Sequence, residues 1–465
     1  MKRLIFLLLI VGFVWLDGCA HVPKVARPSH QTVYIAVDGV PYHLIAELRR
    51  EGHFADFQPP AKVISPFPST TTCGFGAMFR PIGSDIPPGY DREYYSYDRK
   101  AIVSFFESIH PKSPTDFRNL FDYYRRTPFQ KFWIYATPGA SGHRDLVKIR
   151  SLVWSSPAQA QYLTYIGGTD GAGHILGKKR VKHWLIYMEG FLRTMRREYQ
   201  KAFHQDLDIV LFSDHGFHYV RKPNAVSKND IVHRLRRMGL TYSNNLKKTG
   251  HVVAIEWGNI SGANFYADLA YVPKIAQILA ETRGISVVAY PWEGTIRVLS
   301  YRHPTGEYAE VACDGERRRC RYKALSGDPL HYAAAVDHLR AGGRIDRNGF
   351  ASSEDWFEET KDIEFPDALY RLHHAFEGLV KNQASILVST EPDYEYGDVL
   401  TRIGAWLHGG LKGTHGGLFQ EASDAFAMTT DPRIQLPQAL RYDQVMEKLM
   451  DHEAEAAILK RARER

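Results

Sequence analysis

The sequence predicts an α/β fold, in which a central, largely parallel sheet is flanked by helices and carries an inserted, smaller α+β lobe. The first observation is three short apolar or β-branched runs at 32–37, 162–166 and 208–213, typical of parallel strands buried on both faces. The second is the alternation of these runs with loops and helical patterns. The third is a change to short strands around one helix within 250–325. A chain of 465 residues, 44% hydrophobic and 24% charged, has room for such a domain with an insertion.

The N-terminus predicts export. Lys2 and Arg3 precede an uncharged, almost wholly apolar run at 4–16, which is typical of a secretion signal. The run is shorter than the roughly 20 residues that span a bilayer. The sequence therefore predicts a targeting segment outside the fold.

The segment Leu16-Asp17-Gly18-Cys19 resembles the bacterial lipobox, although Asp17 departs from its small or apolar residue. The resemblance implies a signal peptide at 1–18, a lipidated Cys19 and a polar tether at 19–31. An ordinary signal peptide or an uncleaved anchor is the alternative. Ala20 follows Cys19 directly, and this resembles the pattern of lipoproteins sorted to the outer membrane. We therefore expect a lipid-anchored protein of the bacterial cell envelope, on the outer membrane and facing the periplasm.

The charge suits anionic substrates. The chain carries +7, and removal of 1–18 takes away two cations and one anion and leaves +6. There is no dense Lys/Arg stripe with interleaved aromatic residues, so nucleic-acid binding is not indicated.

The elements follow in order along the chain. A metal-binding core is predicted over 32–220 and 385–435, an inserted lobe with connecting segments over 221–384, and a C-terminal helix over 436–465. Further strands are expected at 385–389 and 425–429, where apolar runs recur. A helix is expected at 184–199, where apolar residues recur at helical spacing. Further helices are expected near 41–52, 115–126, 272–284 and 366–380, and a charged helix from about 442.

Cysteine usage points to one disulfide. Cys313 and Cys320 flank the turn signal Asp314-Gly315, and an oxidising compartment would let them close a hairpin. Cys73 would then be unpaired.

Six side chains could bind metal ions. Asp38, Asp170 and Asp214 each follow a predicted strand, and parallel strands bring their carboxyl ends to one edge of the sheet. Burying three carboxylates together is costly without cations. Metal ions are the natural compensation, because two histidines lie in the aspartate motifs and a third lies in a Gly-rich segment later in the chain. Carboxylate and imidazole ligands suit zinc, with manganese or iron as alternatives. These histidines are His174, His215 and His415.

The same motifs resemble the type I phosphodiesterase/nucleotide pyrophosphatase branch of the alkaline phosphatase superfamily. They are VDG with Asp38, the PSTTT loop, TDGAGH, SDHG and GTHGG. The resemblance implies two divalent metal ions, usually zinc: one bound by Asp38, Asp214, His215 and the nucleophile oxygen, the other by Asp170, His174 and His415. The family nucleophile lies three residues after a proline, which indicates Thr71, with Thr70 and Thr72 as adjacent alternatives.

The resemblance implies metal-dependent hydrolysis of a phosphomonoester or phosphodiester through a phosphothreonine intermediate. The substrate would be a phosphorylated small molecule or lipid. Sulfatase chemistry is not favoured, because Cys73 lacks the Pro and Arg of the sulfatase motif. An envelope phosphotransferase that moves head groups, and a non-catalytic envelope lipoprotein that retains the fold, are the alternatives.

Overall fold

A computed structural model describes residues 28–108, 113–124, 137–156, 158–255, 260–301, 306–314, 319–397 and 409–464. The expected signal peptide, the lipidation site Cys19 and most of the expected tether lie outside the described residues. Within the described ranges, no helix has both the length and the apolar character that a membrane span requires.

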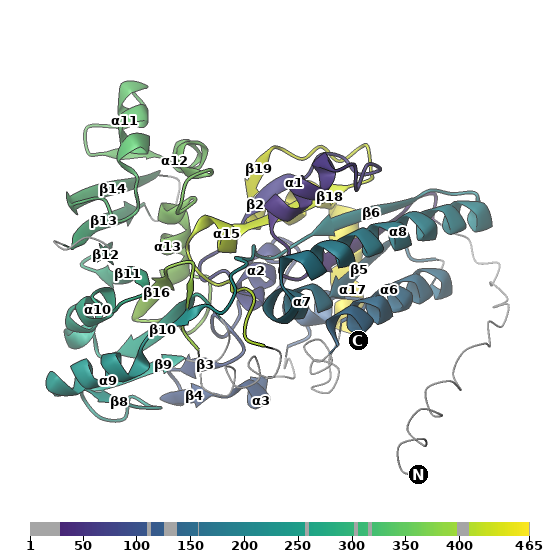
Figure 1. The fold of residues 1–465 in the computed structure, drawn as a ribbon. Helices are drawn as coiled ribbons and strands as arrows, with labels where there is room; N and C mark the ends of the chain where they lie inside the picture. Colours follow the sequence, from purple (N-terminus) through teal and green to yellow (C-terminus); the bar gives the residue numbers. More distant parts are fainter. Residues whose placement is uncertain are drawn as a thin grey trace, which may run out of the picture.

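The first sheet has six strands in the order β19-β2-β18-β6-β1-β5 (Figure 1). β1 is parallel to β5 and β6, β2 is parallel to β19, and only β18 runs antiparallel to its neighbours. The predicted class, α/β with a largely parallel sheet, is confirmed. The strands are β1 (Gln31–Val37), β2 (Ala61–Ile64), β5 (Gln161–Ile166), β6 (Leu207–Phe212), β18 (Asp424–Thr429) and β19 (Ala439–Arg441).

Both faces of this sheet are buried, as the continuous apolar runs predicted. Val33 and Ile35 of β1 pack in one core with α1, α6 and α8, while Tyr34 and Ala36 point to the opposite core, which contains α2. Figure 1 shows α6, α7 and α8 gathered along the sheet. These helices are α1 (Tyr42–Arg50), α2 (Thr71–Met78), α6 (Pro138–Ser155), α7 (Gly168–Leu176) and α8 (Lys178–Phe203).

The second sheet belongs to the lobe and has nine strands in the order β15-β14-β13-β12-β11-β16-β10-β9-β8. All of its pairs are antiparallel except β8 with β9. Cys313 of β13 and Cys320 of β14 face each other and form the predicted disulfide, and Cys73 is unpaired and buried. The strands are β8 (Thr241–Tyr242), β9 (His251–Ile255), β10 (Gly262–Ala267), β11 (Ile285–Trp292), β12 (Thr295–Ser300), β13 (Glu307–Cys313), β14 (Arg319–Ser326), β15 (Phe350–Ser352) and β16 (Ile386–Thr390).

Two predicted boundaries require correction. The core segment expected at 385–435 starts too early, because β16 joins the lobe sheet between β10 and β11. A fully buried apolar strand suits either sheet, so its sequence does not specify its partners. The segment 436–465 is not helical throughout, because β19 first adds an edge strand to the core sheet. α17 (His452–Glu464) then closes the described chain.

The remaining elements are short or belong to the lobe. The helix expected near 115–126 is described only as α4 (Phe117–Leu120). The lobe helices are α9 (Lys228–Arg237), η1 (Leu269–Tyr271), α10 (Val272–Ala280), α11 (Ala333–Ala341), α12 (Ser353–Thr360) and α13 (Ala368–Phe376). The others are β3 (Tyr94–Ser96), β4 (Ala101–Val103), α3 (Phe105–Ser108), β7 (Asn224–Ala225), β17 (Tyr394–Glu395), α15 (Gln420–Ser423), η2 (Tyr442–Gln444) and α16 (Val445–Leu449).

Candidate metal centre

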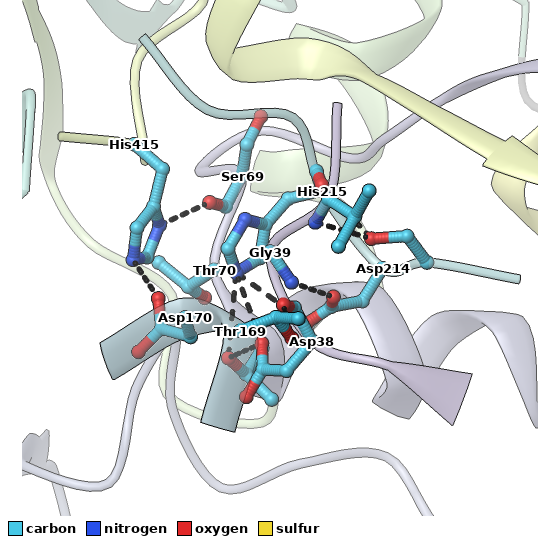
Figure 2. A network of polar contacts seen from close by, with 12 residues as sticks. Asp38, Gly39, Ser69, Thr70, Thr169, Asp170, Asp214, His215 and His415 are labelled. Atoms are coloured by element: carbon cyan, nitrogen blue, oxygen red, sulfur yellow. Dashed lines mark hydrogen bonds and ion pairs between the residues drawn. The ribbon is translucent and has the colours of Figure 1, made fainter. Parts of the chain in front are cut away.

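The carboxyl ends of three neighbouring strands bring the predicted carboxylates together. Val37 of β1 pairs with Ile166 of β5, and Ala36 pairs with Phe212 of β6, so the three strands end level. Asp38 follows β1 directly, and Asp214 follows β6 after one residue. Asp170 lies in the first turn of α7, which begins after β5. Figure 2 shows the three carboxylates in one cluster with His215 and His415.

Asp38, Asp214 and His215 form the first group of donor atoms, all within 4.8 Å of one another. Nε2 of His215 lies 3.5 Å from Oδ1 of Asp38 and 3.4 Å from Oδ2 of Asp214. The backbone N–H of Gly39 donates to the other oxygen of Asp214, at 3.1 Å. This group is the set of residues predicted for one metal ion.

Asp170 is the centre of the second group. Its Oδ1 lies 3.2 Å from Nε2 of His174, one helical turn away, and 3.5 Å from Nε2 of His415. Asp170, His215 and His415 also fall within 4.8 Å of one another, and the rings of His215 and His415 stack at 3.9 Å. The two predicted groups are therefore contiguous, with His215 beside both.

All three histidines present Nε2 to the cluster for the same reason. Their Nδ1 atoms lie against backbone carbonyls, with His174 at 3.0 Å from Gly413, His215 at 2.9 Å from Gly216 and His415 at 3.0 Å from Ser69. A carbonyl only accepts hydrogen bonds, so Nδ1 carries the proton and donates it. In a neutral ring, Nε2 then carries a lone pair that points at the carboxylates. Histidines that bind metal ions are held in this way, with the other ring nitrogen donating a hydrogen bond.

The charges of the cluster fit a divalent cation. Burial, followed by repulsion from Asp214 and Asp170, raises the pKa of Asp38 well above its usual range, and burial also raises the pKa of Asp214. Burial pushes the pKa of Asp170 upward, but the ion pair with His174 outweighs it and the pKa is lowered. Burial and the neighbouring His215 lower the pKa of His415 far below its usual range, so this ring is neutral. Its Nε2 then directs a lone pair at Oδ1 of Asp170, 3.5 Å away, and a cation bound by both atoms would remove the repulsion between them.

The three threonines of the PSTTT loop have different surroundings. Oγ1 of Thr71 donates to Oδ1 of Asp38 at 3.2 Å and lies 3.4 Å from Nε2 of His215. Thr70 is instead the N-cap of α2, because its side chain accepts from the N–H of Cys73, and it donates to the carbonyl of Tyr90. Thr72 points to Asp91 at 3.5 Å. Among the three, only Thr71 contacts the metal-ligand candidates.

Sequence reasoning missed a buried tyrosine that contacts the cluster. The hydroxyl of Tyr165 donates to Oδ2 of Asp38, the oxygen that does not face Thr71. Tyr165 lies on β5 opposite Ala36 of β1. Only this cross-strand register could have revealed it, because Tyr165 belongs to none of the motifs.

A cavity of about 470 Å³ opens beside the start of α2. Arg92 lines it and donates to the hydroxyl of Tyr124 at 3.2 Å, and the Tyr124 ring packs on Tyr165 at 4.7 Å. Volumes of this size accommodate small organic ligands. Other lining residues include Thr72, Asp91, Tyr94, Phe117, Arg118 and Lys381.

A third group of ligand-type side chains lies at the opposite end of the strands. His30 precedes β1 and contacts Asp208 of β6 at 3.0 Å and Asp431 at 3.7 Å. Arg433 contacts both carboxylate oxygens of Asp431, at 2.9 Å for Oδ1 and 2.6 Å for Oδ2. A guanidinium thus already supplies the positive charge there, and the group does not indicate a metal site.

No protein family model and no curated protein matches the chain, whereas solved structures do. Human ectonucleotide pyrophosphatase/phosphodiesterase 5 aligns over 93% of this chain and 95% of its own, with 10% identity and a TM-score of 0.49. An inactive variant of the murine protein in complex with AMP aligns over the same shares, with 11% identity and a TM-score of 0.47. Phosphonoacetate hydrolase from Sinorhizobium meliloti 1021, in complex with phosphonoacetate, aligns over 95% of this chain and 98% of its own, with 11% identity and a TM-score of 0.45. The first two carry the name of the nucleotide pyrophosphatase/phosphodiesterase group that the motifs resemble.

Proposed function

We propose that this protein is a metal-dependent hydrolase of phosphate esters of the alkaline phosphatase type, with Thr71 as its nucleophile. The observation that carries the proposal is the position of the Thr71 hydroxyl, within 3.4 Å of both Asp38 and His215 in a buried cluster of three carboxylates and three histidines. A hydroxyl so placed is typical of an activated nucleophile.

Two divalent ions, most simply zinc, fit the donor set. Asp38, Asp214, His215 and the Thr71 oxygen would hold one ion, and Asp170, His174 and His415 the other. When bound, the ions supply positive charge that lowers the pKa of the hydroxyl and of a water and stabilises the attacking and leaving oxygens.

The chain's own groups then carry the substitution. Oγ1 of Thr71 forms a bond to phosphorus while the bond from phosphorus to the ester oxygen breaks, and the hydroxyl proton is directed at Oδ1 of Asp38, 3.2 Å away. The alcohol leaves with the electron pair and takes a proton from solvent. Water next attacks the phosphothreonine: its oxygen bonds to phosphorus while the bond from phosphorus to Oγ1 of Thr71 breaks. One proton of that water is released to solvent, and Oγ1 of Thr71 regains its proton from Asp38. Tyr165 keeps Asp38 oriented through the other carboxylate oxygen.

The organic part of the ester would occupy the cavity beside α2. Thr72 supports this placement, because it lines the cavity and directly follows Thr71 in the chain. A phosphorylated small molecule or a lipid head group would suit such a cavity. Lipid anchoring at Cys19 would keep the enzyme at the cell envelope, and Cys19→Ser should then move the protein from the membrane fraction to the soluble fraction.

The test measures metal content and turnover together. We expect about two divalent ions per chain, hydrolysis of p-nitrophenyl phosphate or bis-p-nitrophenyl phosphate, and loss of turnover on chelation. Thr71→Ala should remove nearly all turnover. Thr70→Ala is the matched control, because it costs about 1 kcal/mol of stability as a lost helix cap but leaves the Thr71 hydroxyl in place.

Each alternative predicts a different result. A purified protein that takes up neither zinc nor manganese would overturn the metallohydrolase proposal, and would favour a non-catalytic envelope protein. Turnover that requires an added alcohol acceptor would indicate a phosphotransferase. Thr71→Ala with wild-type kcat would exclude Thr71 as the nucleophile.

A further inference from the structure

One buried arginine of the lobe lies against the two loops that frame the metal centre. Arg371 of α13 has no solvent exposure. Its guanidinium donates to the Leu418 carbonyl at 2.9 Å, to the Ser423 hydroxyl at 2.7 Å and to the Ser69 hydroxyl at 3.2 Å. It also donates to the carbonyls of Pro366 at 2.9 Å and Pro66 at 3.5 Å. The guanidinium group therefore connects, through hydrogen bonds, the loop before Thr71 and the loop after His415.

Ser69 transmits this contact into the centre. Its hydroxyl, held by Arg371, donates to the carbonyls of Pro66 and Gly417 at 2.9 and 3.2 Å. Its own carbonyl accepts from Nδ1 of His415 at 3.0 Å, and this bond aims Nε2 of His415 at Asp170. Figure 2 shows His415 between Ser69 and Asp170. Ser69 also lies two residues before Thr71, so the position of this serine affects both the proposed nucleophile and His415, a metal-ligand candidate.

The contacts of Arg371 favour a geometric role over an ion pair. All five acceptors are neutral oxygens, and burial lowers the pKa of Arg371 to about 10. The neighbouring carboxylate of Asp367 instead pairs with Arg441, at 2.6 and 3.0 Å. Burying a cation against neutral oxygens is expensive. The planar guanidinium group, however, directs several N–H donors in fixed directions at once, which the ammonium group of a lysine does not do.

We propose that Arg371 is a positioning residue that sets the placement of Thr71 relative to His415 through Ser69. The inference rests on the proposed function, because His415 is taken as a metal ligand. Through Arg371, the lobe would then help to hold the loops of the metal centre in place, in addition to any contact it makes with the substrate.

The experiment compares Arg371→Lys with Arg441→Lys, two buried arginines whose guanidinium groups are replaced by the same ammonium. Zinc affinity is measured by competition with a chelator, alongside kcat, KM and melting temperature. We expect both variants to melt earlier, and only Arg371→Lys to lose zinc affinity, by about 10- to 100-fold for one ion, as for other residues that orient metal ligands. Its kcat should fall more than its KM changes.

Backbone hydrogen exchange supplies a readout that needs no metal. In the metal-free protein, exchange at 69–74 and 415–423 should be faster in Arg371→Lys than in Arg441→Lys. Wild-type zinc affinity and wild-type exchange in Arg371→Lys would overturn the inference. A wild-type protein that binds neither zinc nor manganese would overturn the proposed function instead, and the exchange rates alone would then test whether Arg371 fixes the two loops.

Discussion

The close approach of α2 to the end of β6 makes Gly74→Ala an informative perturbation. A Cβ at Gly74 would lie 2.7 Å from the carbonyl oxygen of Asp214 and 2.8 Å from its Cβ. Ordinary contact begins at 3.4 Å, so the backbones must separate by about 0.7 Å. The two sides of this contact carry Thr71 and Asp214, so the variant moves the nucleophile relative to a metal-ligand candidate.

A displacement near 1 Å at reacting groups lowers rates on the order of 100-fold, and overpacking costs about 1 to 3 kcal/mol of stability. We therefore expect Gly74→Ala to lose between about tenfold and 100-fold in kcat, measured with p-nitrophenyl phosphate at a temperature where circular dichroism shows it folded. The control is Gly190→Ala, also within a helix, where the added Cβ meets nothing within 4 Å. That variant should keep its kcat and gain about 0.5 to 1 kcal/mol. A folded Gly74→Ala protein with wild-type kcat would show that the contact between Gly74 and Asp214 does not set the position of Thr71.

Two further predictions concern stability. Replacing Cys313 and Cys320 together by alanine should lower the free energy of unfolding by about 2 kcal/mol in urea titrations, because the disulfide closes a short loop, while metal content stays unchanged. An equal urea midpoint with and without reductant would contradict this. Burial, opposed by Lys62, raises the pKa of Asp424 to about 7 from 3.8, so the folded state binds its proton more tightly than the unfolded state. This proton binding stabilises the folded state by on the order of 4 kcal/mol below pH 4, and the stabilisation is lost as the pH rises to about 7. Asp424→Asn should therefore reduce the pH dependence of the free energy of unfolding between pH 4 and 7. An unchanged pH dependence in this variant would contradict the prediction.

The residues of the centre that could be predicted are those with local signals. Asp38, Asp214 and His215 follow buried strands, and Asp170 and His174 lie one helical turn apart in a Gly-rich segment. Parallel strands place such residues at one edge whatever the rest of the chain does. The fold class was also predictable from local patterns, because buried strands appear in the sequence as short apolar runs and amphipathic helices as apolar residues at helical spacing.

The supporting residues could not be predicted, because their partners are distant in sequence. Arg371 and Ser69 are 302 residues apart, and Tyr165 is 127 residues from Asp38. Neither Arg371 nor Tyr165 has a spacing that distinguishes it from an ordinary helix or strand residue. The placement of β16 has the same cause, since pairing of a fully apolar strand depends on register with strands far along the chain.

The position of β16 changes how the lobe relates to the core. Ser389 of β16 accepts from the N–H of Leu418 at 2.9 Å, and Ser261, next to β10, donates its N–H to the His415 carbonyl at 2.6 Å. The hydroxyl of Ser261 also donates to Thr414 at 2.7 Å. The loop that carries His415 is thus held from the lobe sheet on one side and by Ser69 on the other. One candidate ligand of the second ion therefore depends on both sheets, so the centre forms only where the folded lobe and the folded core meet.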